Sequence, residues 1–264
     1  MKELCADLRE EYAALDAFAA ELSHPQWEAE TPFLGWTVYD QIAHITFIDG
    51  QALLATQDVE ALEQSVANVS DVLREGGSMP RAIDRFMGGP LQPEVLLERW
   101  RTTRTELLKT FEAVDPKTRF PWYGPKMGVR SFATARLMET WAHGQNVYDA
   151  VGKQRTCSDR LRHIAHLGVA TFGWSFQNRG LVAPEVALRV ELSSPSGALW
   201  EWGDPEASDR VTGAAEEFCL VVTRRRHVLD TALVREGEVA RRWMEIAQCF
   251  AGPVLDAPEP TGAA

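Results

Sequence analysis

The sequence predicts a mixed α and α/β fold, in which an N-terminal antiparallel four-helix bundle is followed by a small α+β domain. Long stretches with apolar residues at helical spacing occupy the first two thirds of the 264-residue chain. Shorter stretches that alternate in hydropathy, as strands do, begin after residue 182. We therefore expect the bundle over residues 1–182, the α+β domain over 183–252 and a disordered tail over 253–264.

The predicted helices of the first domain follow from apolar periodicity and from capping signals. Thr37 and Asp40 match a capping box, so a helix is expected to begin after Thr37. Gly152 stands where a C-terminal glycine ends a helix. Glycine pairs break the stretch 58–89, which we expect to be irregular, and 115–127 is expected to be a loop. The expected helices cover residues 3–23, 37–57, 92–114, 131–151 and 158–178.

The second domain is predicted to contain both strands and helices. Its strongest strand signal is the alternation over residues 186–192, and two shorter strands are expected over 200–202 and 210–212. Residues 214–229 and 236–250 have the spacing of amphipathic helices.

The composition excludes several functional classes. A net charge of −11 and a pI of about 5.1 argue against a nucleic-acid partner, which needs a basic surface. No segment approaches 18 uninterrupted apolar residues, so we expect no membrane partner, and the N-terminus lacks the apolar core of a signal peptide. Four widely spaced cysteines without a CxxC motif fit reduced thiols in the cytoplasm: Cys5, Cys157, Cys219 and Cys249.

Two separated segments carry the candidate chemistry. Glu139 and His143 are four residues apart, so on a helix they lie on one face, one turn apart. If His44 comes from a facing helix, the three side chains can surround one divalent metal. Three protein ligands leave a coordination position open, as a catalytic metal requires. Zinc is our first choice of metal, with iron, nickel and cobalt as alternatives.

Other polar residues can support this site or bind its substrate. Asn146, one turn past His143, can orient a ligand, and so can Asp40, although its capping role already accounts for it. In the basic run 223–227, Arg224 and Arg225 can either hold a substrate carboxylate or form a solvated cluster at a helix end. The sequence has no GxGxxG, Walker A, GxSxG or HExxH motif.

The two candidate segments resemble those of the mycothiol-dependent maleylpyruvate isomerase family, within the DinB-like metal-binding superfamily. The segment 31–44 is similar to the one that leads into the family's first metal histidine, and 138–146 to the one with its Glu-x-x-x-His ligands. The resemblance implies that His44, Glu139 and His143 bind the metal. Residues 186–251 resemble the family's small sterol-carrier-like domain, whose active-site arginine corresponds to Arg224 or Arg225.

The chain also departs from the family. Asn146 replaces an aspartate that members often carry, and the long segment 58–89 resembles that of a subgroup of metal-binding proteins with no assigned reaction. Both departures weaken transfer of the substrate.

Three hypotheses for the function follow. The first is a metal-dependent isomerase or transferase in which a small thiol such as mycothiol attacks a small unsaturated or electrophilic carboxylate. The second is a thiol-independent cyclase, hydrolase or hydratase that uses the metal as a Lewis acid. The third is a non-catalytic protein that binds a small apolar ligand. A monomer and a homodimer both remain open.

Overall fold

The computed structural model describes residues 1–123 and 126–262. They form two compact units, Met1–Gln154 and the part that begins at Arg155, and we describe each by itself. The mixture of helices with small sheets agrees with the predicted fold class. The division lies earlier than the predicted boundary at 182, because the helices that follow Arg155 pack against elements of the second unit. No helix in the described part of the chain is long and apolar enough to cross a membrane.

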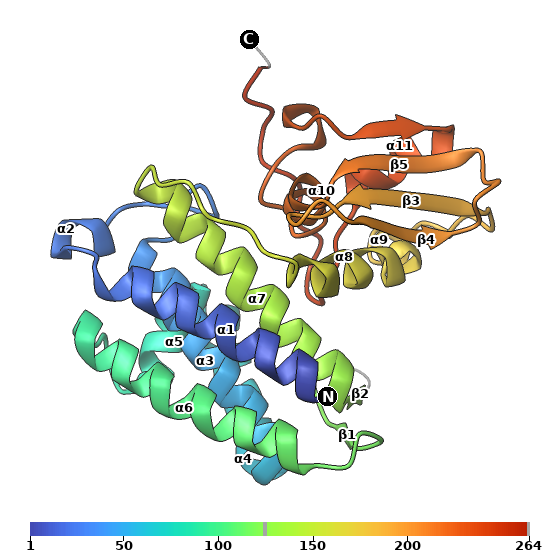
Figure 1. Cartoon of the computed structure of the whole chain (residues 1–264). Helices are drawn as coiled ribbons and strands as arrows, with labels where there is room; N and C mark the ends of the chain where they lie inside the picture. Colours follow the sequence, from blue (N-terminus) through green and yellow to red (C-terminus); the bar gives the residue numbers. More distant parts are fainter. Residues whose placement is uncertain (124–125, 263–264) are drawn as a thin grey trace. The chain divides into compact units, whose positions relative to one another are not determined.

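Four long helices build the first unit. Helix α3 packs against both α6 and α7, and α1 packs against the same two helices (Figure 1). Apolar side chains from all four helices fill the interior, and Leu8, Ile42, Trp100 and Phe132 are fully buried. The bounds of these helices are α1 (Lys2–Ala20), α3 (Val38–Gln57), α6 (Pro93–Ala113) and α7 (Val129–Ala150).

The predicted capping box at the start of α3 is confirmed. The Thr37 hydroxyl accepts a hydrogen bond from the Asp40 backbone N–H at 3.2 Å, and the Asp40 carboxylate accepts one from the Thr37 N–H at 2.8 Å. The cap satisfies N–H groups that have no partner inside the helix. It also fixes where α3 begins, and thereby the face on which His44 lies.

The prediction of an irregular stretch over 58–89 was wrong. This stretch contains α4 (Val59–Arg74) and α5 (Met79–Met87). Asp58 and Ser78 cap the two helices, and Gly88 ends α5 in the left-handed conformation at φ +84°. The glycine pairs therefore separate two short helices.

The structure contains a short helix and a short pair of strands that were not predicted from the sequence. The four-residue helix α2 (His24–Trp27) lies between α1 and α3. An antiparallel pair of strands, β1 (Arg119–Phe120) and β2 (Met127–Gly128), lies in the predicted loop 115–127 and extends one residue beyond it. Gly124 and Pro125 of that loop lie outside the described residues.

The second unit is built around a four-stranded sheet in the order β4-β3-β5-β6 (Figure 1). Strands β3 and β5 are parallel, and the two outer pairs are antiparallel. The sequence signal for β6 was missed, because three residues are too few to show alternation. The strands are β3 (Leu188–Ser193), β4 (Leu199–Gly203), β5 (Asp209–Ala214) and β6 (Val234–Glu236).

The helices of the second unit are shorter than predicted. The helix expected over 158–178 is divided at Thr171, where the backbone leaves helical geometry (φ −98°, ψ 16°). The helix expected over 214–229 ends at Val222, and a 3₁₀ turn follows at Val228–Asp230. The bounds are α8 (Leu161–Ala170), α9 (Phe172–Gln177), α10 (Ala215–Val222) and α11 (Glu238–Ile246).

The C-terminal segment has defined contacts where disorder was expected. Residues 253–262 contain no helix or strand, but Arg179 donates hydrogen bonds to the Leu255 carbonyl and to Asp256. Thr261 donates to the Asp230 carboxylate at 2.7 Å. Residues 263–264 of the predicted tail lie outside the described residues.

A buried carboxylate links three of the long helices in the first unit. Asp49 of α3 is 1% exposed and accepts hydrogen bonds from the Tyr12 hydroxyl of α1 and the Trp100 indole N–H of α6, both at 3.0 Å. Burial raises the pKa of Asp49 to about 6, although the charge of Arg136 and the two hydrogen bonds oppose the rise. The native state therefore holds a proton on Asp49 at a pH where the unfolded chain has lost it.

This shift predicts that Asp49 weakens the fold as the pH rises. The stabilisation from its raised pKa is complete below the unfolded value of 3.8 and is lost as the pH rises through about 6. From about pH 4 to pH 7, the unfolding free energy of the wild type should fall by about 2.5 kcal/mol relative to Asp49→Asn. Urea denaturation at several pH values measures this difference, and parallel pH profiles for the two proteins would contradict it.

Asp16→Asn provides a control of opposite sign. Burial raises the pKa of Asp16, but hydrogen bonds and charges from Arg101 and Arg104 outweigh burial and lower it. The stabilisation from Asp16 is therefore present above the unfolded pKa and is lost as the pH falls.

Candidate metal centre

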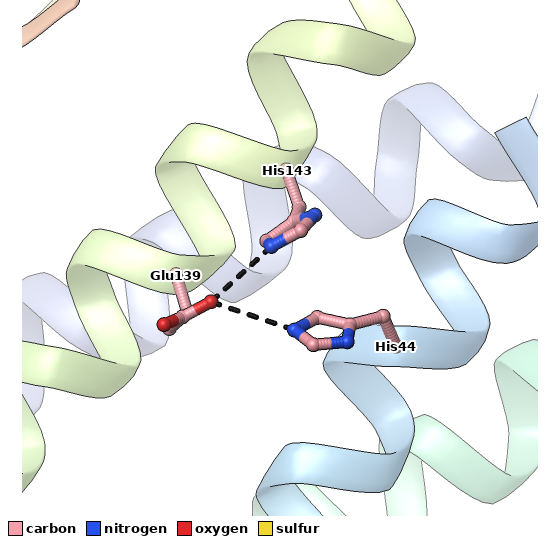
Figure 2. A group of neighbouring side chains, drawn as sticks. All are labelled: His44, Glu139 and His143. Carbon is pink, nitrogen blue, oxygen red and sulfur yellow. Dashed lines mark ion pairs between the residues drawn. The ribbon is translucent and has the colours of Figure 1, made fainter. Parts of the chain in front are cut away.

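Three potential metal ligands converge between α3 and α7. His44 comes from α3, and Glu139 and His143 come from successive turns of α7 (Figure 2). One Glu139 oxygen, Oε2, lies 3.2 Å from His143 Nε2 and 3.6 Å from His44 Nε2. The two imidazole rings are 4.4 Å apart between centroids. All three ligand atoms lie within 4.8 Å of one another, so one ion can contact all of them.

The two separations between Glu139 and the histidines are close to those expected around a single metal ion. Ligand atoms bound at about 2.0–2.2 Å in a tetrahedral arrangement are separated by about 3.3–3.6 Å. Two imidazoles and one carboxylate are a donor set that suits zinc and also iron, nickel or cobalt. The three residues therefore fit a divalent metal and leave at least one of its coordination positions to another ligand.

The charge state of Glu139 also suits a metal ligand. Its side chain is 20% exposed, and burial alone would raise the pKa of the carboxyl group. Hydrogen bonds from His143 and His44, together with the charge of Arg136, outweigh burial and hold the pKa well below its usual range. Glu139 therefore carries a negative charge at neutral pH.

A glutamine that the sequence did not identify orients His143. Gln41 is fully buried, and its Oε1 lies 2.6 Å from His143 Nδ1 and 3.0 Å from the Asn146 side-chain nitrogen. Its own amide donates to the Thr31 hydroxyl at 2.8 Å. Because an amide oxygen only accepts hydrogen bonds, Nδ1 of His143 must carry the proton. Without a metal, a protonated Nε2 donates to Glu139, and on losing that proton it would offer its lone pair to a metal beside Glu139.

A signal for Gln41 was present in its spacing. It lies three residues before His44, on the adjoining part of the same helical turn.

His44 differs from His143 in its hydrogen bonds, because its Nδ1 is buried and has no hydrogen-bond partner among residues 1–123 and 126–262. The protein therefore fixes the tautomer of His143 more firmly than that of His44.

Aromatic side chains cover the two histidines. The Trp36 ring lies 5.3 Å from the His44 ring and is stacked at 6.1 Å on the His143 ring. Phe33 meets His143 edge-on at 5.5 Å. These apolar rings lower the local polarity, which strengthens electrostatic interactions at the ligands.

A strained turn positions these rings. Leu34 (φ +55°) and Gly35 (φ +67°) both have left-handed backbone conformations, and the Trp36 N–H closes the turn on the Phe33 carbonyl at 3.0 Å. The left-handed conformation costs a non-glycine residue such as Leu34 about 1 kcal/mol or more. The strain is offset by the contacts that the turn gives its two aromatic residues.

The other residues proposed from sequence have different surroundings. Asn146 contacts the Gln41 amide and so touches His143 only indirectly. The Asp40 carboxylate contacts the backbone and hydroxyl of Thr37, which gives it the capping role. Arg224 and Arg225 belong to the second unit, where both are buried.

The main-chain setting of Arg224 is unusual. It has a left-handed backbone (φ +61°), and its Nη1 donates to the Glu245 carbonyl at 2.8 Å. Burial lowers its pKa to about 10.

Comparison with known families identifies the first unit. Residues 8–148 match the model of the mycothiol maleylpyruvate isomerase N-terminal domain, a range that includes all three candidate ligands. The chain belongs to this family. The resemblance predicted from the two ligand segments is therefore confirmed.

Similar full-length proteins occur in Mycobacterium tuberculosis. The proteins MT0041 of strain CDC 1551 and Rv0036c of strain H37Rv, both described as uncharacterized, are each 42% identical to this chain over 252 residues. The match covers 94% of this chain and 95% of each relative.

Solved structures share the fold. The crystal structure of the mycothiol-dependent maleylpyruvate isomerase matches with a TM-score of 0.52 at 14% identity, and a histidine-to-alanine mutant of that enzyme matches with a TM-score of 0.54 at 15% identity. Each match covers 85% of this chain and 89% of the other. Helices and strands of this family member are thus arranged in a known fold.

The contact between Gln41 and His143 predicts that Gln41 strengthens metal binding. In Gln41→Leu the Nδ1–H of His143 loses its acceptor, so zinc affinity should fall about 10- to 100-fold while the three ligands remain. Competition with a zinc chelator measures this change. The matched control is Gln64→Leu, because Gln64 is an amide on α4 that bonds only Asn68 among the described residues. Equal affinity in the wild type and Gln41→Leu would contradict the proposed role.

Proposed function

We propose that this chain is a cytoplasmic, divalent-metal-dependent enzyme of the isomerase or transferase type that uses a small thiol such as mycothiol. The single observation that carries the proposal is the convergence of His44, Glu139 and His143 within 4.8 Å from two helices. Family membership supports the use of mycothiol. We further propose that α1, α3, α6 and α7 form a DinB-like four-helix bundle, which their pairwise packing supports.

The residues of the site suit thiol chemistry on a small electrophilic acid. Zinc held by the three ligands would lower the pKa of a bound thiol and supply a Lewis acid. Gln41 would keep His143 in the tautomer that has its lone pair on Nε2, and the negative charge of Glu139 would balance the metal. Trp36 and Phe33 would exclude water from the thiol.

The proposed isomerisation conserves atoms and electrons. The thiolate sulfur forms a bond to one carbon of a carbon–carbon double bond, and the π electrons move onto the conjugated carbonyl to give an enolate. Rotation then takes place about the new single bond. Collapse of the enolate breaks the carbon–sulfur bond and releases the thiolate with the other geometric isomer.

Arg224 and Arg225 are proposed to bind a substrate carboxylate. A guanidinium binds a carboxylate through two parallel hydrogen bonds, which suits this role better than the point charge of lysine. The assignment rests on the family resemblance of the helix that precedes them.

The proposal predicts about one equivalent of bound metal per chain. Zinc, measured by mass spectrometry after purification, should be present in the wild type and lost in His44→Ala and His143→Ala, because two ligands hold zinc poorly. His166→Ala is the matched control, because His166 is an exposed histidine of the second unit. Circular dichroism checks that each variant is folded. Equal metal content in all four proteins, or none in any of them, contradicts the proposed centre.

Thiol binding separates the proposal from thiol-independent Lewis-acid catalysis. In protein loaded with cobalt(II), mycothiol should produce a sulfur-to-cobalt charge-transfer band, because soft thiolates coordinate such ions directly. Loss of this band in cobalt-treated His143→Ala would confirm that the thiol reaches the metal. Cobalt-loaded wild type that gives no band at saturating mycothiol would leave a cyclase, hydrolase or hydratase as the better function.

A further inference from the structure

Arg136 of α7 is a buried cation. Its residue is 3% exposed, and its Nε makes no hydrogen bond with any residue that the structure describes. Within residues 1–123 and 126–262, no carboxylate forms an ion pair with Arg136, and no acceptor takes a hydrogen bond from its guanidinium. A guanidinium has five N–H donors, and burying them without acceptors is costly. The group is therefore prepared for an acceptor that is not part of this chain.

The neighbours of Arg136 leave its hydrogen-bonding edge free. The Trp122 ring lies 5.2 Å from Cζ, in a cation–π contact that uses the face of the guanidinium. Such a contact leaves the N–H groups in the guanidinium plane without acceptors. The charge of Asp49 acts on Arg136 from beyond ion-pair distance.

Arg136 lies on the helical face that carries the metal ligands. It precedes Glu139 by three residues and His143 by seven, so it lies about one and two turns, or roughly 5 and 10 Å, away along α7. Its charge also contributes to the lowered pKa of Glu139. Both belong to the first unit, so their relation is independent of the second unit.

A second donor without a partner in the described chain lies on α3. Gln51 follows His44 by seven residues, is fully buried, and has no partner for its side-chain nitrogen in the described chain. Its oxygen accepts a hydrogen bond from Tyr123 at 3.4 Å, and the charge of Arg136 acts on Tyr123. Tyr123 therefore connects Gln51 with the surroundings of Arg136.

We infer that Arg136 and Gln51 form an anion subsite, which binds a carboxylate of a small acid while the acid's reacting carbon lies beside His44, Glu139 and His143. The inference rests on the proposed function and adds where the acid binds. The groups of Arg136 and Gln51 that lack partners are N–H donors, which suits an anion and not a cation. The spacing of one to two helical turns fits an acid of a few carbon atoms.

Maleate, a four-carbon dicarboxylate, is the probe for this subsite. Calorimetric titration of the zinc-loaded protein should show that maleate binds the wild type and that Arg136→Met weakens binding about 10- to 100-fold, the loss expected for charged hydrogen bonds. Arg136→Lys keeps the positive charge beside Asp49 and so protects the fold, but it lacks the planar fork and should bind at an intermediate strength. Zinc content should be equal in all variants.

Arg130→Met is the matched control, because Arg130 is an exposed arginine on the same helix. It makes the same change in net charge and should leave maleate affinity unchanged. Equal maleate affinity in the wild type, Arg136→Met and Arg136→Lys overturns the subsite, and so does a wild type that binds no maleate. Failure of the proposed function can be told apart from failure of the subsite, because it appears as absence of metal in the wild type. The subsite can then be tested by titrating maleate into the metal-free protein.

Discussion

The Glu139 carboxylate between two histidines is the interaction on which the candidate metal centre of the first unit depends. One oxygen of this side chain lies within 3.6 Å of nitrogen atoms from both α3 and α7. A largely buried carboxylate is costly unless cations, hydrogen bonds or a metal balance it. The histidines and Arg136 provide that balance in the protein itself. The same arrangement provides the ligand geometry that a divalent metal requires.

Several polar side chains are buried among the apolar residues of the first unit. Asp49 and Gln41 are both buried, and each has hydrogen bonds that connect helices or orient a ligand. Arg136 and Gln51 are also buried, but their donors lack acceptors among the described residues. Networks with satisfied groups stabilise a fold, whereas unsatisfied ones are typical of sites that bind ligands. This contrast is the basis for proposing that Arg136 and Gln51 bind a substrate.

The turn at Leu34 and Gly35 gives the site its apolar cover. Two successive left-handed residues bring Phe33 and Trp36 against the histidine rings. Both residues belong to the segment 31–44, which resembles the family's first ligand segment, and the larger of the two rings is that of Trp36. In the structure the ring is partly exposed and lies on the imidazoles. Its position therefore serves the site as much as the packing.

The sequence by itself determined the long helices, the family and the candidate ligand residues. Apolar periodicity and the Thr37–Asp40 cap locate α3, and a four-residue spacing places Glu139 and His143 on one face, because these are properties of a single helix. Short elements such as β6 and the division at Thr171 had too little periodic signal to be predicted.

Only the tertiary structure decided which polar residues meet across helices. The bond from His143 to Gln41, the burial of Asp49 and the unpaired donors of Arg136 depend on how α3 and α7 pack. Local spacing contains no information about a partner a hundred residues away. Contacts of this kind arise when helices that each bury an apolar face bring their few inward polar groups together.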